Sequence, residues 1–566
     1  AFASHMFHGS HQLARMKYGM DLGDLIEEAG REAKTTRSPV RSGLVVEQAK
    51  KNHDYVMNPT SNRIAQMATQ GAFMWYLAQS PAAALVNMSQ TFTVAPAKLA
   101  AFHDKGAAVG IPVALGQLNK AMFDLGMGRT FAEKSPRVTP AEKAAVQEAY
   151  RFGLITRTQS HDVAGIGDSG IKYSPVRAKL MAAMSFMFHH TERINREATF
   201  LAGYRMARRR GLDQKNAIRK AAELTWDSHY DYQNSSRPAV MHSNTGKALL
   251  VFRNYSMNML ADLAYTAYEM INPRNKQERK EARTQMLGLG ATLAFNAGIR
   301  GLPLYGLLMM IAGMFTDDGE DPEVELKKTL LQHLPKPMVG MMMDGVPGYL
   351  SGTELSGRMG FGDLWFRSDD MDREGDEQYL YWMQQVMGAA AGVPYNWYRG
   401  MSQISDGYTW RGIETMAPKA IKDPMKAYRY YSEGVATKNG DPIVDDVGGW
   451  NVAKQALGFT PAKVTEQYKL NSYNMNKQKE IVAERSKLLG DFYKAWKSGD
   501  EKQSDQIIDK MRTYSEKYPE MRIDGDAVRS SLTRREKYRG SALGGMNYNQ
   551  KLVPRLQDEQ PGSVYR

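Results

Sequence analysis

One uninterrupted helical run constrains this chain more than any other feature. It begins at Ser174-Pro175, a pair typical of a helix N-terminus, and it continues to Gly211, a residue typical of a helix C-terminus. At 1.5 Å per residue the run would be roughly 54 Å long. Its stripe predicts packing against neighbouring helices, from this chain or from another copy. The stripe keeps a four-three spacing interrupted only by polar Thr191, and consists of Leu180, Met184, Met187, Ile194, Ala198 and Leu201.

Helix signals dominate the rest of the chain, and the alternation typical of strands is nearly absent. Thr139-Pro140-Ala141-Glu142 is a capping box, and Ser80-Pro81 and Thr460-Pro461 also indicate helix starts. We expect a further helix from Asn244 to Ile271, closed by Asn272-Pro273. The predicted fold class is therefore mainly α, a multi-part helical assembly with long loops between about 316 and 450 and an extended C-terminal tail.

The composition divides the chain into five expected regions, since 566 residues exceed the usual size of one domain. These are an N-terminal helical region (1–135), a basic helical region (136–285), an apolar region rich in glycine and methionine (286–400), a loop-rich connector (401–459), and charged helices with an extended tail (460–566). The chain opens without an initiator methionine or a secretory signal, so we expect a piece of a longer polypeptide or a tag remnant.

Charge and sulfur content limit the classes of function. The net charge of +13 and the pI near 9.4 favour polyanionic partners, either nucleic acid or an anionic membrane. The absence of cysteine excludes disulfides, thiol catalysis and zinc ribbons. The 36 methionines suit surfaces that pack in more than one arrangement.

A basic cluster covers the C-terminal half of the long helix and the residues that follow it, and is the candidate DNA-facing site. The helix C-terminal dipole explains part of it, and a solvated helix face explains more. Phosphate contact is the functional alternative, and it would make binding fall as salt rises. The members are Arg193, Arg196, Arg205, Arg208, Arg209, Arg210, Lys215, Arg219 and Lys220.

The stretch 286–315 is strongly apolar and carries one charge, Arg300. Spanning a bilayer needs about 20 continuous apolar residues, and Asn296, Arg300 and Pro303 cut this stretch into shorter halves. Two interpretations remain open, a pair of buried helices or a membrane-inserting hairpin whose arginine faces an aqueous lumen. The candidate membrane or lumen element comprises Arg300, Pro303, Leu304, Leu307, Leu308, Met309, Met310 and Ile311.

Several motifs suggest chemistry without the context that chemistry needs. GIGDSG (165–170) has the glycines of a dinucleotide loop but no preceding strand, and Ser160-His161-Asp162 cannot form a triad from consecutive residues. His189 and His190 with Glu192 lack a second metal-binding motif. The glycines around Glu354 indicate sharp turns that pack on the apolar helices, while a glycosidase-type acid would need a partner carboxylate. We therefore expect no catalytic residue, no metal and no cofactor.

Six strings along the chain resemble one family, the large internal virion proteins of short-tailed bacteriophages, in the C-terminal region labelled the PLxRFG domain. The namesake string is not intact, because Arg151-Phe152-Gly153 lacks the Pro-Leu and Pro303-Leu304 lacks the rest. In chain order the strings are SPAAALVNMSQTFTV, GLITRTQSHDVAG, HHTERINREATFLAGYRMARRRG, FRNYSMNML, GVPGYLSGTELSGRMGFGDL and LGFTPAKVTEQY.

The resemblance implies a structural protein that is packaged inside the capsid and ejected with the genome. Such a protein would form a homo-oligomer and, with other phage ejection and portal proteins, a conduit for non-specifically bound double-stranded DNA through the host envelope, in contact with the periplasm and the host membrane. The lytic transglycosylase Glu-Ser pair of some relatives is absent here. Two alternatives stay open: a peptidoglycan-degrading virion enzyme with Glu354 as acid, and a DNA-binding scaffold inside the capsid.

Overall fold

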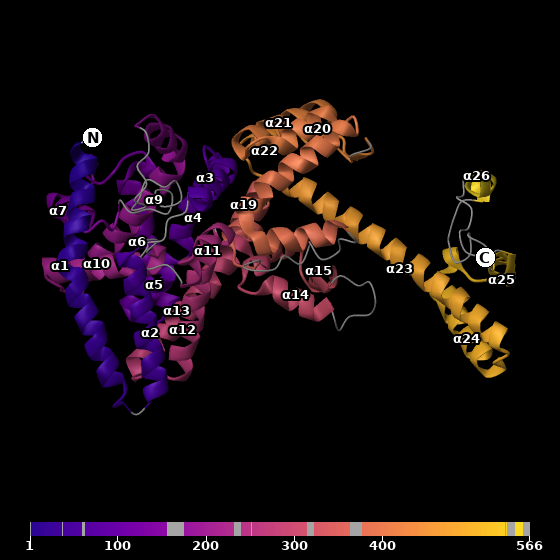
Figure 1. The fold of residues 1–566 in the computed structure, drawn as a ribbon, viewed down its shortest axis with the longest axis horizontal. Helices are drawn as coiled ribbons and strands as arrows, with labels where there is room; N and C mark the ends of the chain where they lie inside the picture. Colours follow the sequence, from indigo (N-terminus) through magenta and orange to yellow (C-terminus); the bar gives the residue numbers. More distant parts are fainter. Residues whose placement is uncertain are drawn as a thin grey trace. The chain divides into compact units, whose positions relative to one another are not determined.

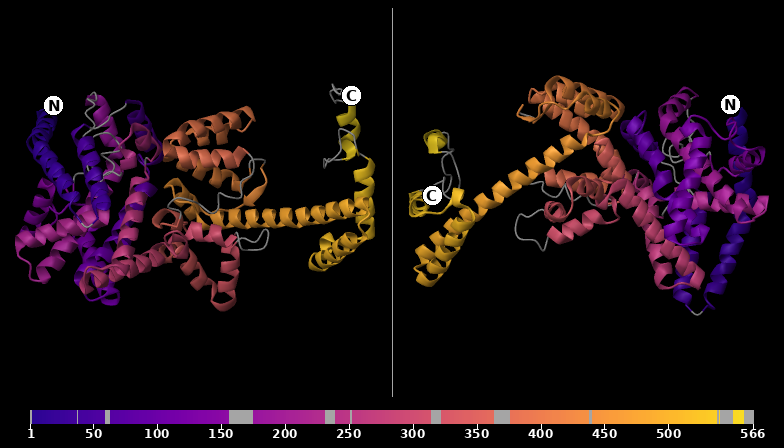
Figure 2. Two further views of the ribbon diagram at one scale, coloured as in Figure 1. Left: turned by 60° about the horizontal axis from the view of Figure 1, so that its bottom comes forward. Right: turned by 180° about the vertical axis from the view of Figure 1, so that it is seen from behind.

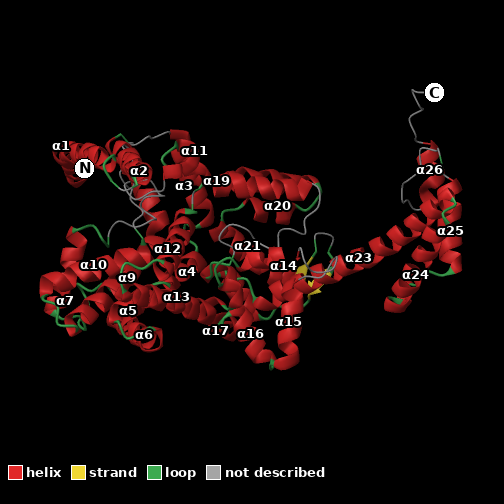
Figure 3. Cartoon of the chain, turned by 90° about the horizontal axis from the view of Figure 1, so that it is seen from below, coloured by secondary structure: helices red, strands yellow, loops and turns green. Residues whose placement is uncertain are grey.

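The fold is mainly α, as the sequence predicts, and helices make up 80% of the structure, a computed structural model (Figure 3). Contacts divide the chain into two units, one of Ala1–Met314 with Pro322–Tyr468 and one of Phe315–Asp321 with Lys469–Arg566. The structure describes residues 2–36, 38–58, 63–155, 175–230, 239–250, 252–313, 322–362, 376–437, 440–537, 539 and 550–558.

The first half of the first unit contains helices α1 (Phe2–Ala33), α2 (Pro39–Met57), α3 (Arg63–Tyr76), α4 (Pro81–Thr93), α5 (Ala95–His103), α6 (Ala107–Asp124), η1 (Gly126–Gly128), α7 (Pro140–Arg151), α9 (Pro175–Arg209), α10 (Gln214–His229), η3 (Ala239–Met241), α11 (Asn244–Leu249), α12 (Asn254–Ile271) and α13 (Lys276–Ala297) (Figure 1). The predicted starts at Ser80 and Thr139 are confirmed. The Ser80 side chain accepts a hydrogen bond from Ala83 N, and Thr139 forms the full capping box with Glu142.

The second half of that unit contains η4 (Ile299–Gly301), α14 (Tyr305–Gly313), α15 (Pro322–His333), α16 (Lys336–Asp344), α17 (Val346–Ser351), α18 (Ser356–Met359), α19 (Asp376–Ser405), α20 (Thr409–Met416), α21 (Lys419–Glu433), β1 (Val435–Ala436), β2 (Pro442–Val444), α22 (Gly449–Ala456) and the start of α23 (Ala462–Ser498). The two strands pair antiparallel, with Val435 opposite Val444.

Helix α9 is the centre of the largest core. It packs against α4, α6, α7 and α10, and from residue 191 to residue 207 every side chain except half-buried Arg193 is buried. The predicted stripe is confirmed in this part, where Ile194, Ala198 and Leu201 are fully buried. Towards the N-terminus the stripe opens, and Leu180 is 54% exposed. Gly211, at φ +83°, follows the helix as the sequence predicts.

The prediction of one helix from Asn244 to Ile271 is wrong, because α11 ends at Leu249 and α12 begins at Asn254. Phe252 between them has φ +68°, a left-handed backbone that no α-helix can contain. Its ring packs edge-on against Tyr76 of α3, with ring centroids 6.5 Å apart, in a small apolar cluster around Phe73. Tertiary packing of one aromatic ring therefore overrides a helical pattern that is locally continuous.

The expected connector 401–459 is more helical than its composition indicates, because α20, α21 and α22 occupy most of it. Its prolines do not mark loops. Pro418 precedes α21, and Pro424 lies inside the same helix. The glycines do mark turns, since Gly434 (φ +71°) and Gly448 (φ +78°) flank the β-hairpin.

The apolar stretch 286–315 is interrupted where the sequence predicts. Helix α13 ends at Ala297, η4 carries Arg300, and α14 begins only at Tyr305 after Leu304, whose φ is +64°. Within the described residues, no helix combines the length and the apolar character needed to cross a membrane.

The second unit is a helical hairpin with a third helix beside it. It contains the rest of α23, then α24 (Glu501–Lys517), η6 (Pro519–Met521), α25 (Gly525–Lys537), η7 (Gln550–Leu552) and α26 (Val553–Asp558). Helix α24 folds back along α23 (Figure 2), where the Tyr514 hydroxyl donates to Ile481 O at 2.9 Å. Leu489, Ala495, Ile507 and Met511 form its core.

Two glycines allow the ends of α13 and α16 to meet backbone to backbone. A Cβ at Gly298 (φ +68°) would lie 2.3 Å from Met343 O, and one at Gly345 (φ +78°) would lie 2.6 Å from Asn296 O. The glycine-rich segment continues this contact, because Phe361 N donates to Gly301 O at 2.8 Å. Gly345, Gly360 and Gly362 therefore allow close packing against the end of α13 and against η4, which agrees with the packing role that the sequence predicts.

We predict that Gly298→Ala lowers the free energy of unfolding by several kcal/mol, because the new methyl group collides with a backbone oxygen in a left-handed conformation. Gly290→Ala is the matched control, since it lies in α13 with nothing within 4 Å of the added Cβ. It should stabilise by roughly 0.5–1 kcal/mol through helix propensity. Thermal unfolding midpoints of the two variants check both signs, and equal effects would contradict the packing argument.

Candidate functional site

The nine basic residues predicted to face DNA separate into a buried group and an exposed group. Arg205 is 9% exposed, and it joins Asp124 (2.7 Å) and Glu142 (2.6 Å) in a two-carboxylate ion pair. Arg196 is 2% exposed and donates to the carbonyl oxygens of Leu154 (3.1 Å) and Tyr230 (2.9 Å). Neither side chain can reach a phosphate in this fold, so the prediction was wrong for both.

These two arginines are buried because α9 is surrounded by neighbouring helices and still carries polar residues. A buried charge is tolerated only where partners satisfy it. Arg205 links α9 to the end of α6 and the start of α7 through its two ion pairs. Arg196 donates hydrogen bonds to carbonyl oxygens of residues that follow α7 and α10. The run of basic residues was ambiguous, since the basic side chains of a helix can be exposed to solvent or buried against other parts of the same chain.

Six of the nine residues surround the turn between α9 and α10, and we call them the basic turn. Arg208 and Arg210 are exposed but anchored, because Arg208 donates to Leu212 O at 2.7 Å and Arg210 lies 4.6 Å over the Phe102 ring. Lys220 pairs with Glu223 at 2.6 Å. The remaining members, Arg209, Lys215 and Arg219, are exposed.

The ninth residue, Arg193, lies at a pocket of about 340 Å³. Its guanidinium stacks 4.0 Å over the Phe131 ring and donates to the Tyr150 hydroxyl at 2.7 Å. The Arg193 Nε is buried without a hydrogen-bond partner among the described residues. Lys134, Arg151 and Glu133 also line the pocket, so its lining is predominantly positive and suits a small anion.

A buried carboxylate supports the floor of this pocket. Tyr150 donates its hydroxyl proton to Glu197, and Ala132 N donates to the same carboxylate at 2.8 Å. Burial raises the pKa of Glu197 above its ordinary value, and burial together with the nearby Glu197 raises the pKa of Tyr150. Glu197 is fully buried and does not line the pocket, so it positions Tyr150 and Arg193 and cannot itself reach a ligand.

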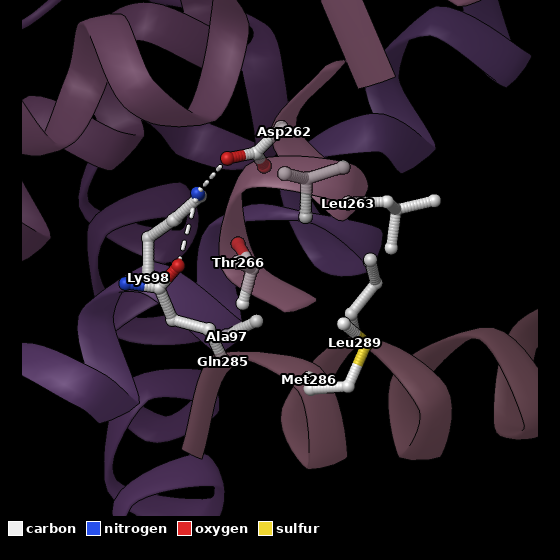
Figure 4. A pocket seen from close by; sticks show the side chains of 9 residues that line it. Ala97, Lys98, Asp262, Leu263, Thr266, Gln285, Met286 and Leu289 are labelled. Carbon is white, nitrogen blue, oxygen red and sulfur yellow. Dashed lines mark hydrogen bonds and ion pairs between the residues drawn. The ribbon is translucent and has the colours of Figure 1, made fainter. Parts of the chain in front are cut away.

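A second hollow lies between α5, α12 and α13 (Figure 4). Lys98 donates to Asp262 at 2.6 Å and to Gln285 Oε1 at 3.1 Å, as the dashed lines of Figure 4 mark. The hollow measures about 10 Å³, which is no more than the space of one water molecule. This arrangement therefore joins three helices through a paired lysine and holds no ligand site.

Arg300 of the apolar stretch is held inside the fold. It pairs with Glu323 of α15 and Asp344 of α16, and its side chain is 17% exposed. Burial alone would lower the pKa of Arg300, but the two carboxylates outweigh burial and raise it. Of the other predicted members, Pro303, Leu307 and Met309 are half-buried. Leu304, just before α14, and Leu308 and Ile311 on α14 are exposed. The side chain of Met310 lies outside the described residues.

The remaining chemical motifs have structural partners or lie elsewhere. Glu354 Oε1 accepts from Ser356 Oγ (2.6 Å) and Gly357 N (3.1 Å), so it caps the short helix α18. The His190 ring lies 2.9 Å from Gly128 O, and no group of metal-binding side chains gathers among the described residues. GIGDSG and Ser160-His161-Asp162 lie outside the described residues.

Comparison of this chain with protein-family models, with curated proteins and with solved structures finds no match.

His229 gives the α9 core a testable dependence on pH. It is buried at the end of α10, with Nε2 2.8 Å from Thr199 Oγ1. Burial, reinforced by the charge of Arg196, lowers the pKa of His229 from 6.5 to about 3. As pH falls, the unfolded chain therefore takes up this proton first, and the free energy of unfolding falls between pH 6.5 and pH 3.

We predict that this histidine removes roughly 1.4 kcal/mol of stability per pH unit below 6.5. The difference between wild type and His229→Gln, measured by urea unfolding at pH 7 and pH 5, isolates it from other titrating groups. The variant should show a flatter dependence on pH. Identical slopes in both proteins would mean that His229 accepts a proton in the folded state.

Proposed function

We propose that this chain is a structural subunit of a genome-ejection assembly of a short-tailed bacteriophage, with non-specific contact to double-stranded DNA and no catalytic step of its own. The family resemblance of the six strings, which occur in one order along most of the chain, motivates the phage assignment. The basic turn is the structural observation that carries the DNA contact.

The basic turn suits a phosphate backbone because its charges are exposed and presented on a rigid support. Arg209, Lys215 and Arg219 extend from two helices whose packed faces belong to the main core, so the charges keep a fixed spacing. Phosphate contact alone confers affinity without sequence preference. Such binding allows DNA to slide past the protein.

Self-association is supported by apolar side chains that the fold leaves exposed on ordered helices. On α20 and α21, Trp410 is 44% exposed, Ile421 56%, Tyr428 62% and Tyr431 77%, and the rings of Trp410 and Tyr428 are 5.9 Å apart. Aromatic residues of this kind are enriched at protein interfaces. A second copy of the chain is the occupant that an oligomeric conduit requires, and contact with the host membrane remains part of the same proposal.

The phage assignment predicts where the protein is found. Full particles should contain it in their interior, and particles that have released their genome should lack it, because an ejected protein leaves with the DNA. Electron microscopy together with mass spectrometry of particles before and after ejection measures this. Retention in the emptied particle would contradict ejection and favour the internal scaffold.

We predict that replacing Arg209, Lys215 and Arg219 by glutamine reduces the slope of log affinity against log salt by roughly 2–3, about 0.9 for each lost phosphate contact. Duplexes of unrelated sequence should give the same reduction. The matched control replaces the exposed Lys120, Lys276 and Lys336 by glutamine, with the same change in net charge. If both triple variants lose equal affinity, total charge and not the basic turn governs binding.

A further inference from the structure

Helix α21 exposes apolar side chains on one side and partly buries lysines on another, which is the reverse of an ordinary surface helix. Ile421, Tyr428 and Tyr431 are exposed on one side. Lys419, Lys422 and Lys426 recur at spacings of three and four, so they share a face with Tyr430 four residues further on. Tyr430 is 3% exposed and belongs to the core around the β-hairpin. The lysine face therefore points inward, and all three lysines are half-buried.

The three lysines lack the partners that half-buried charges usually have. None forms an ion pair or a hydrogen bond with any residue in the described part of the chain, and the one ring contact is Lys426 at 5.4 Å from the Tyr430 centroid. The nearby carboxylate of Glu414 is already occupied by both nitrogens of Arg429, at 2.9 Å and 3.1 Å.

The surroundings of the lysine face are strongly positive. Arg358 and Arg399 lie within electrostatic reach of Lys419 and Lys422, and Arg429 within reach of Lys426. Among the described residues, the carboxylates of Glu414 and Asp423 lie within electrostatic reach of these lysines. Asp423 also accepts a long hydrogen bond from Gln455 at 3.5 Å. Tyr468 of α23 also faces Lys426.

The pKa values of the three lysines agree with their half-buried, positively charged surroundings. Burial and the neighbouring cations lower the pKa of Lys419, Lys422 and Lys426 below the ordinary value. Like charges that are held together and partly dehydrated destabilise a fold unless an anion neutralises them. Lys454, also buried, shows the structural alternative, because its ammonium donates to Ser351 O (2.8 Å) and Gly352 O (2.9 Å).

We propose that the inward face of α21, with Lys419, Lys422 and Lys426, is a binding site for closely spaced phosphate groups. The site is distinct from the basic turn and does not depend on the proposed phage function. A linear polyphosphate and a stretch of nucleic-acid backbone share this chemistry, and the experiment separates them. Three ammonium groups at successive helical turns match phosphates that are linked to one another better than a single phosphate.

The test uses the full chain, sodium tripolyphosphate and a 20-base-pair DNA duplex as separate ligands, and two measurements for each variant. Lys422→Met keeps the length of the side chain and removes the charge. We expect it to weaken calorimetric binding of tripolyphosphate at least tenfold and, without ligand, to raise the thermal unfolding midpoint. Lys419→Met is the second variant, with the same expectation.

Lys454→Met is the matched control, because it should lower the unfolding midpoint and leave tripolyphosphate binding unchanged. If Lys422→Met weakens only duplex binding, the phosphates belong to nucleic acid, and the site stands. If neither ligand binds more weakly to Lys422→Met and Lys419→Met, or if both variants lower the midpoint as Lys454→Met does, the lysines are structural and the proposal fails. If only the triple variant of the basic turn loses duplex binding, the conclusion about the lysine face of α21 does not change.

Discussion

The ion pair of Arg205 with Asp124 and Glu142 is the interaction on which the main core depends. One guanidinium on α9 forms ion pairs with carboxylates from two other helices, and all three side chains are 13% exposed or less. Removing Arg205 would leave two carboxylates without a counter-charge in a dry interior, which costs several kcal/mol. The pair therefore fixes the rotation of α9 about its axis. With α9 in this orientation, Arg196 points towards the carbonyl oxygens that accept its hydrogen bonds, and Arg208 to Arg210 point towards solvent.

Much of the helical architecture follows from local sequence signals. The capping box at Thr139, the start at Ser80 and the end at Gly211 are local hydrogen-bond or backbone preferences, and the structure confirms each one. The break at Phe252 was not predictable, because its cause is a ring of α3 far away in sequence. The same holds for the connector 401–459, where Pro424 lies inside a helix that tertiary contacts support.

The candidate sites also combine features that local sequence predicts with features that depend on tertiary contacts. A run of arginines predicts positive charge, and the exposed basic turn follows from the sequence. Which arginines are buried depends on partners such as Leu154 O and Asp124, and no spacing within one helix reveals these. The lysine face of α21 was missed because Lys419, Lys422 and Lys426 resemble an ordinary solvated stripe. Only the burial of Tyr430 on the same face shows that the stripe points inward.

The hydrogen bond from Thr292 to Thr93 O spans 199 residues and bears on the order in which the fold is reached. Closing a loop of that length costs more conformational entropy than the shorter closures around α9, such as the 63 residues between Glu142 and Arg205. Entropy of chain closure thus favours early assembly of α4 to α10 and later docking of α13 onto the finished bundle. A chain that leaves a narrow exit N-terminus first would therefore complete the contacts among α4 to α10 before α13 can dock.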